Sequence, residues 1–379
     1  MSAFSQFASH KHRVVRMGRL AYVRGWERTM AKDNSVAIAE TLLPRVLVLA
    51  TGGTISGTSD ERSAIGYDAG GVMGVELVAG VRGLDDLARL QVEQIANIAS
   101  QNMNASVWFQ LAERIRQAWS EDEADAVVII HGTDTLEETA FFLDTILPYG
   151  RPVVLTGAMR PATALGADGP ANLYEAVKVA ASPLAHNRGV LAVLNGDIHA
   201  ARRVSKTHTT ALQTFRSLNG GPVGFVDAET VRFVSQVTQQ GKPAFLTLPV
   251  HPVLPSVEIV FAHAGMEARP IDRVVADGVR GLVVAGMGDG NVSEAALGGL
   301  DRAVAAGVVV VRASRVAEGF VNRNVEVADD RHGLVASLDM NPQKARILLQ
   351  LLLANDVTAP GDVQRMFLAS TGGAFSDND

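Results

Sequence analysis

The stretch RVLVLATGG at residues 45–53 opens a series of apolar segments that decides the fold. Similar runs rich in valine, isoleucine and leucine follow, as AVVIIHGTD at 126–134 and RPVVLTGAM at 151–159. Continuous apolar runs of this kind are typical of strands that are buried on both faces. The remaining runs are GVLAVLNGD at 189–197, GLVVAGMGDG at 281–290 and GVVVVRAS at 307–314. The sequence therefore predicts buried strands in both halves of the chain.

Segments with helical periodicity separate these strands. The predicted helices are residues 106–119, 136–147, 170–181, 293–306 and 342–354. Asn341 is a suitable cap for the last of them, and Pro342 suits its first position. Alternation of strands and helices predicts an α/β protein with a mostly parallel sheet.

The alternation weakens after Phe225, and proline dipeptides within residues 242–255 favour extended connecting backbone. A length of 379 residues agrees with two domains at roughly 100 to 200 residues each. We predict an N-terminal extension at residues 1–43 and a larger catalytic domain at 44–233. A linker at 234–255 then leads to a smaller C-terminal α/β domain at 256–379.

Composition excludes several classes of protein. Hydrophobic residues make up 47% and charged residues 20% of the chain, which is typical of a globular core. The absence of cysteine excludes disulfides, thiolate metal sites and a cysteine nucleophile. A formal net charge of −6 argues against nucleic acid as a partner. The sequence contains no run of roughly 18 apolar residues, which is the length that predicts a membrane span.

The N-terminal extension differs in charge from the rest of the chain. Residues 1–29 carry six basic residues and one acidic residue, a net +5 that leaves −11 on the other 350 residues. We expect the extension to be disordered, and either a functional tail or sequence upstream of a start at Met30. Because its charges interrupt every apolar run, it lacks a secretory signal's apolar segment of roughly 7 to 15 residues. We therefore predict a cytoplasmic protein, with the periplasm left open.

Polar clusters follow several predicted strands, at the edge where open α/β sheets bind ligands. They are TGGT at 51–54, SQ at 100–101, HGTDT at 131–135 and SKT at 205–207. Taken singly, TGGT is typical of a tight turn and SQ of a loop. HGTDT is typical of a helix cap, and the lysine of SKT is typical of a solvated surface residue. Taken together, they supply hydroxyls, a carboxylate and a lysine, which suit a hydrolase or transferase that uses a threonine nucleophile.

His131 is best interpreted as a buried histidine at a strand end. It has neither an HExxH motif nor a second histidine at the spacing of a metal site. We expect no metal and no other cofactor.

With these clusters in view, the chain resembles bacterial-type L-asparaginases of the type II-like class, which are two-domain amidohydrolases that convert asparagine to aspartate and ammonia. The resemblance extends from about Val46 to Phe367. The matching motifs are ATGGTI at 50–55, ASQNMN at 99–104, HGTDTLEETAFFLD at 131–144, GAMRP at 157–161, ADGPANLYEAV at 167–177, SKT at 205–207 and NPQKARILLQ at 341–350.

The resemblance implies five catalytic residues. Thr54 corresponds to the nucleophile that forms an acyl-enzyme, and Tyr67 to the tyrosine that assists it. Thr133, Asp134 and Lys206 correspond to a hydrogen-bonded set, in which Thr133 helps the chemistry or activates water.

Further residues are implied to bind the substrate, with Thr133 among them. Asp134 corresponds to the acceptor of the substrate's α-ammonium group, and Ser100 and Gln101 to the pair that fixes its amino-acid end. The carbonyl group of Ala158 corresponds to the acceptor for the leaving amide.

The resemblance also implies features beyond the single site. They are a left-handed crossover in the larger sheet, a lid at 55–66 hinged at Tyr67, and a homotetramer built as a dimer of intimate dimers. In such an assembly, Asn291 and Glu326 would reach into the neighbouring subunit's site.

The resemblance further implies that asparagine is preferred over glutamine as the substrate, on the residues at three positions: Gln101, Ala158 and Asn291. A glutaminase-asparaginase is the nearest alternative, and a non-catalytic amino-acid-binding protein of the same fold is a remote one. Asp289 and the lid sequence depart from the family pattern, so they bear on lid kinetics and substrate ratio rather than on the chemistry.

Overall fold

The computed structural model describes residues 43–57, 71–235 and 246–371, which fall in one compact unit. The N-terminal extension, Tyr67 and most of the expected lid lie outside these residues. In the described part of the chain, none of the helices combines the length and the apolar character that a bilayer crossing requires.

Within the described residues, the larger sheet has eight strands in the order β10-β9-β6-β5-β4-β3-β1-β2. Five neighbouring strands, from β5 to β2, are parallel, and the other three pair antiparallel at the β5 side. The strands are β1 (Arg45–Gly52), β2 (Arg89–Ile98), β3 (Ala126–Ile130), β4 (Val153–Thr156), β5 (Val190–Leu194), β6 (Asp197–Ala200), β9 (Gly224–Val226) and β10 (Val231–Phe233).

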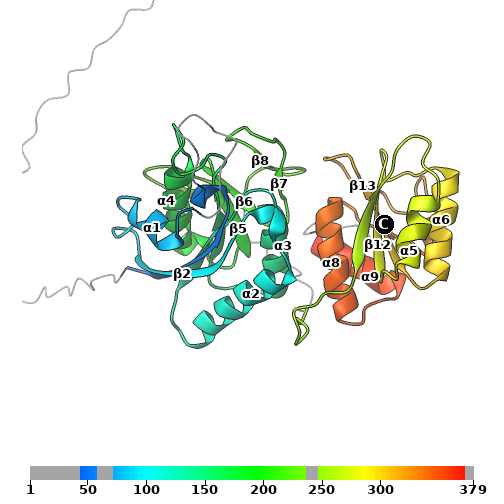
Figure 1. Cartoon of the computed structure of the whole chain (residues 1–379), viewed down its shortest axis with the longest axis horizontal. Helices are drawn as coiled ribbons and strands as arrows, with labels where there is room; N and C mark the ends of the chain where they lie inside the picture. The colour runs from blue at the N-terminus through cyan, green and yellow to red at the C-terminus, as the bar shows by residue number, and fades with distance from the viewer. Residues whose placement is uncertain (1–42, 58–70, 236–245, 372–379) are drawn as a thin grey trace, which may run out of the picture. The chain divides into compact units, whose positions relative to one another are not determined.

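Helices cover both faces of this sheet, as Figure 1 shows. Side chains alternate along β1, so Leu47 and Leu49 face one hydrophobic cluster while Val46 and Val48 face another. The first cluster includes Trp108 and residues of α2 and α3, and the second includes residues of α1 and α4. These helices are α1 (Gly74–Ala79), α2 (Ala105–Ser120), α3 (Leu136–Ile146) and α4 (Gly169–Ala180).

The smaller C-terminal sheet is parallel throughout, in the order β11-β12-β13-β14. Helices α5 and α6 pack on one face of this sheet and α8 on the other (Figure 1). Its strands are β11 (Val257–Phe261), β12 (Gly281–Gly286), β13 (Val309–Ser314) and β14 (Val335–Ala336). Its helices are α5 (Arg269–Ala276), α6 (Glu294–Ala305), α7 (Asp329–His332), α8 (Pro342–Ala354) and α9 (Pro360–Ser370).

The predicted α/β fold with a larger, mostly parallel sheet and a smaller second one is confirmed. The side chain of Asn341 caps α8 by accepting a hydrogen bond from the Lys344 amide at 3.0 Å. Strand β2 was not predicted, because RLQVEQIANI mixes polar and apolar residues, as suits a half-buried edge strand. The domain boundaries and the left-handed crossover stay predictions.

Candidate active site

The strands β1, β2 and β3 are parallel neighbours, so their carboxyl ends meet at one edge of the larger sheet. Three sequence-predicted residues follow these ends. Thr54 begins a short 3-10 helix after β1, Ser100 begins another after β2, and Thr133 lies in the turn after β3. All three side chains are buried, and Thr54 is 6% exposed. The sheet topology therefore gathers residues that are distant in sequence.

Two glycines bring the ends of β1 and β3 into contact. A Cβ atom on Gly53 would lie 2.3 Å from the Gly132 Cα atom, and the φ angle of Gly53 is +89°. A side chain at position 53 is therefore excluded both by space and by backbone conformation. Because Thr54 and Thr133 directly follow these two glycines, their main chains start from the same point of contact.

Lys206 joins the two other predicted catalytic residues. Its Nζ atom donates hydrogen bonds to Thr133 Oγ1 at 2.9 Å and to Asp134 Oδ1 at 2.7 Å. The Lys206 side chain is 17% exposed, whereas that of Asp134 is 52% exposed. A carboxylate that is held by an ammonium group on one side and open on the other is suited to bind a further cation. The solvated interpretation of Lys206 is wrong, since tertiary contacts fix its amine.

Ser100 links the end of β2 to the turn after β3. Its hydroxyl group accepts a hydrogen bond from the Asp134 amide at 3.1 Å, and its carbonyl group accepts one from Thr135 Oγ1 at 2.7 Å. The HGTDT cluster does supply the N-cap residue of α3, Thr135, as is typical of such a cluster, but without the side-chain hydrogen bond of a cap. Gln101 is exposed beside this link.

His131 has the structural role that its sequence context suggested. It is 0% exposed, its Nδ1 atom lies 2.6 Å from the Gly132 carbonyl oxygen, and its Nε2 atom lies 2.8 Å from Thr139 Oγ1. Trp108 Nε1 also donates to Thr139 Oγ1, at 2.8 Å. Since a carbonyl oxygen can only accept, we assign the proton of the neutral ring to Nδ1. Burial lowers the pKa of His131 to about 4, so the ring is neutral near pH 7.

His131 and His199 should make the fold sensitive to acid. Burial lowers the pKa of each ring from 6.5 to about 4. As the pH falls from 6.5 to 4, the unfolded chain binds protons at these rings that the folded chain does not. The free energy of unfolding is expected to fall by about 3 kcal/mol per histidine across this window.

This expectation is tested by urea midpoints measured from pH 7 to pH 4.5. In acid, the urea midpoint of the His199→Asn variant should decrease less than that of the unaltered chain. The urea midpoint of the His263→Asn variant, whose substitution is at an exposed position, should decrease as much as that of the unaltered chain. Parallel pH curves for His199→Asn and the unaltered chain would contradict the prediction.

The loop after β4 is held by a residue to which sequence reasoning gave no role. Both carboxylate oxygens of Asp168 accept hydrogen bonds at 2.9 Å, one from the Met159 amide and one from the Arg160 amide. Ala158, directly before them, is 0% exposed. Asp168 therefore fixes the main chain in which the predicted Ala158 carbonyl lies. The sequence signal was the acid that precedes Gly-Pro in ADGPANLYEAV.

Asn291 and Glu326 also lie together, in the C-terminal sheet domain. The Asn291 side-chain amide donates a hydrogen bond to Glu326 Oε2. Among the hydrogen bonds found within the described ranges, none joins this pair to Thr133, Asp134 or Lys206. The structure therefore assembles two groups of predicted site residues, one that includes Thr133, Asp134 and Lys206 and another made of Asn291 and Glu326.

A buried ion pair fixes the loops that carry Asn291 and Glu326. Arg312 on β13 is paired with Asp329 through two hydrogen bonds of 2.8 Å, and the two side chains are 1% and 0% exposed. The same guanidinium group donates to the carbonyl oxygen of Asp289 at 2.5 Å and to that of Asn322 at 2.8 Å. These carbonyl groups lie near Asn291 and Glu326 in the chain.

The Asp289 carboxylate strengthens this connection. Its oxygens accept hydrogen bonds from the Asn322 amide at 2.7 Å and from Asn322 Nδ2 at 2.9 Å. The acid at this position therefore ties one loop to the other.

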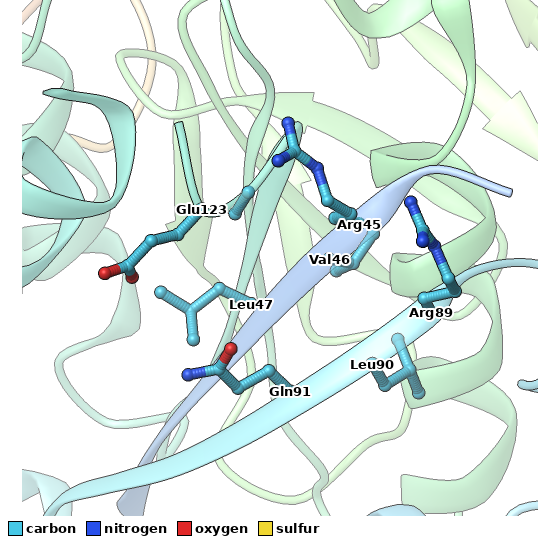
Figure 2. A pocket seen from close by; sticks show the side chains of 8 residues that line it. Arg45, Val46, Leu47, Arg89, Leu90, Gln91 and Glu123 are labelled. Atoms are coloured by element: carbon cyan, nitrogen blue, oxygen red, sulfur yellow. The ribbon is translucent and has the colours of Figure 1, made fainter. Parts of the chain in front are cut away.

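No group of three or more potential metal-ligating side chains occurs in the described part of the chain. Figure 2 shows a hollow whose lining includes Arg45 and Arg89, the first residues of β1 and β2. It is therefore at the opposite end of β1 from Thr54. The Arg45 guanidinium group is already paired with Asp122 at 3.1 Å and Asp125 at 2.7 Å. Its charge is therefore engaged within the chain.

Two family models match the chain: "Asparaginase, N-terminal" at residues 45–239 and "Glutaminase/Asparaginase C-terminal domain" at residues 256–367. A protein named L-asparaginase 2 from Escherichia coli strain K12 is 42% identical over 336 residues, which cover 87% of this chain and 94% of that protein. A Haemophilus influenzae protein named probable L-asparaginase periplasmic is 43% identical over 328 residues, covering 86% and 93%.

The structural comparison agrees with these matches. The crystal structure of a probable cytoplasmic L-asparaginase from Campylobacter jejuni has a TM-score of 0.82 to this chain at 38% identity, covering 86% of this chain and 99% of that one. Because the two family models together cover the larger sheet and the C-terminal sheet, this chain belongs to the asparaginase family.

Proposed function

We propose that this chain hydrolyses L-asparagine to L-aspartate and ammonia through an acyl-enzyme formed on Thr54. The observation that carries the proposal is the position of Lys206 Nζ, 2.9 Å from Thr133 Oγ1 and 2.7 Å from Asp134 Oδ1. Thr133 directly follows Gly132, which lies against Gly53, and Gly53 directly precedes the buried Thr54. The names of the relatives support an amidohydrolase.

The chemistry follows from a hydroxyl nucleophile and preorganised donors. Thr54 Oγ1 attacks the side-chain amide carbon, with Tyr67 assisting removal of its proton, and a tetrahedral oxyanion forms. Backbone amide groups at the strand ends stabilise the oxyanion. Its collapse breaks the C–N bond, and the nitrogen leaves as ammonia after it takes up the proton. Water, activated at Thr133, then hydrolyses the ester and restores the hydroxyl of Thr54.

Substrate binding is proposed to use both signs of charge. The exposed face of the Asp134 carboxylate accepts the α-ammonium group, while Ser100 and Gln101 fix the amino-acid end. The Ala158 carbonyl group accepts the leaving amide. A second copy of the chain would complete each site with its Asn291 and Glu326, within a homotetramer built as a dimer of intimate dimers.

Steady-state kinetics on the two amides test this function. Ammonia release should give a kcat/KM for L-asparagine that exceeds the value for L-glutamine by at least about 10-fold, because an extra methylene shifts the amide relative to Thr54. A chain beginning at Met30 should behave like the full chain. A folded, assembled protein that releases no ammonia from L-asparagine would refute the proposal.

The same measurement decides between the alternatives. Comparable kcat/KM values on both amides would establish a glutaminase-asparaginase, an activity that the description of the C-terminal family model includes. Binding of aspartate without any turnover would establish an amino-acid-binding protein. The cytoplasmic location stays a prediction, since the names of the relatives include both compartments.

A further inference from the structure

We propose that Glu137 is a positioning residue for Lys206, holding the main chain of the lysine while Thr133 and Asp134 hold its side chain. This inference rests on the proposed function for its kinetic consequence. Its geometry stands independently of that function. One short segment, residues 133–137, would thereby fix Lys206 at both of its ends.

Among the described residues, the strand that carries Lys206 is paired with another strand on one edge alone. Lys206 ends β7 (Val204–Lys206), which pairs antiparallel with β8 (Phe215–Ser217) in a two-stranded sheet. Thr207 continues the β8-facing edge, since its amide donates to the Thr214 carbonyl at 2.8 Å. Backbone groups alternate between the two edges of a strand. The amide of Lys206 and the carbonyl of Val204 therefore face away from β8.

Two buried charged side chains occupy this second edge in place of a strand. Glu137 Oε2 accepts a hydrogen bond from the Lys206 amide at 2.8 Å. Lys344 Nζ donates to the Val204 carbonyl group and, at 3.0 Å, to that of Arg202. Glu137 is 5% exposed and Lys344 is 2% exposed. An acceptor for the amide and a donor for the carbonyl are what a neighbouring strand would supply.

Helix α8 of the C-terminal sheet fixes Glu137 in turn. Glu137 Oε1 accepts hydrogen bonds from Gln343 Nε2 at 2.6 Å and from Asn341 Nδ2 at 3.3 Å. Asn341 is the N-cap residue of α8, and its amide also donates to Ser205 Oγ at 3.2 Å. The carboxylate is therefore bonded at both oxygens. The first turn of α8 is connected through it to the amine-bearing residue of the site.

This connection has a chemical consequence. A lysine side chain has four rotatable bonds and is flexible. The position of its amine therefore depends on how firmly the main chain of the lysine is held. Misplacement of a catalytic group by about 1 Å can lower the rate on the order of 10²-fold. A buried carboxylate is not in itself a source of stability, and burying it requires several hydrogen bonds. Positioning of Lys206 is a role that accounts for all three of the hydrogen bonds to Glu137.

Glu137→Gln tests the role with little change in shape. The amide of a glutamine can satisfy either the Lys206 N–H or the donors of α8, but not both, because one of its ends is itself a donor. We expect kcat on L-asparagine to fall at least about 10-fold, with a much smaller change in KM. Glu138→Gln, one residue further along and without a hydrogen bond to Lys206, is the matched control and should retain kcat.

The double variant Glu137→Gln with Gln343→Glu separates positioning from general stability. The new carboxylate at position 343 can accept from the amide at position 137, whose oxygen then faces the Lys206 N–H again. We expect this swap to recover most of the lost kcat. A swap that restores the urea midpoint but leaves kcat low would overturn the inference, as would a folded Glu137→Gln variant with unchanged kcat.

Hydrogen exchange of the Lys206 amide provides a readout that does not depend on turnover. In the full assembled protein, the peptide containing this amide should exchange faster in Glu137→Gln than in Glu138→Gln. An unaltered chain that is inactive on L-asparagine would refute the proposed function and leave this exchange comparison standing. Equal exchange in the two variants would refute the inference itself.

If Glu137→Gln fails to fold, Gln343→Met carries the test, because it removes one donor from Glu137 without contacting Lys206. Gln343→Met should lower kcat and accelerate exchange of the Lys206 amide, as is expected for Glu137→Gln. Unchanged values for both would overturn the proposal.

Discussion

Thr54→Ala chains are expected to release ammonia from L-asparagine on the order of 10⁴-fold more slowly than the unaltered chain, or more slowly still. A methyl group cannot form the acyl ester, so the proposed first step is lost. The main chain at this position should persist, since the Gly57 amide donates to the Thr54 carbonyl group at 2.8 Å. Aspartate binding, measured by calorimetry, should therefore remain.

Thr51→Ala is the matched control, three residues earlier in the same segment. The Thr51 hydroxyl group is buried and donates to the Ile130 carbonyl at 3.1 Å, so its loss should cost about 1 kcal/mol of stability. Its kcat should stay within about 10-fold of the unaltered value. If Thr54→Ala retained substantial turnover, the assignment of the nucleophile would be wrong.

The Thr54→Ala variant also tests whether active sites are shared between subunits. Glu326→Ala chains should also be impaired, because the proposed site borrows this carboxylate from a second copy. When Thr54→Ala and Glu326→Ala chains are dissociated and reassembled together, about a quarter of the sites should be intact, by random pairing across a two-fold interface. Turnover in the mixture that does not exceed that of the separate variants would contradict subunit sharing.

Arg312→Met is expected to lower the free energy of unfolding by about 3 to 5 kcal/mol. The substitution leaves the carboxylate of Asp329, which is 0% exposed, without its ion-pair partner. It also removes the donor to the Asp289 and Asn322 carbonyl groups, which hold two loops together. Urea unfolding at fixed protein concentration measures the effect.

An exposed ion pair supplies the contrast. Arg302 and Asp272 make a bidentate pair at 2.8 Å, but their side chains are 58% and 44% exposed. Arg302→Met should therefore cost no more than about 1 kcal/mol. Similar costs for Arg312→Met and Arg302→Met would contradict the argument from burial. In Arg312→Met, turnover should also fall in the folded protein, because Asn291 and Glu326 lose their common support.

Local sequence was sufficient to predict the central strands and the principal helices. The runs at 126–134 and 151–159 contain β3 and β4, because a strand buried on both faces needs apolar residues at every position. It was insufficient for β2, whose polar and apolar residues mix at the sheet edge, and for the three-residue β7, which is too short to carry a pattern.

The candidate site shows the same division. Gly53 and Thr54 could be selected because a turn of glycines after a buried strand places a hydroxyl at the sheet edge. The family motif added Lys206, whose type and neighbours are otherwise those of a solvated lysine. Glu137 received no role, since a glutamate in the first turn of a helix is common for reasons of the helix dipole alone.

The sequence by itself determined the fold class, the strand ends that bear threonines and the absence of thiol chemistry, because each depends on residue types over a few positions. Tertiary structure decided which distant groups bond to one another. Glu137 reaches the amide of Lys206 across 69 positions and the side chain of Asn341 across 204. Hydrogen bonds act over about 3 Å in space, so partners this far apart in the chain become evident only once both sheets have folded.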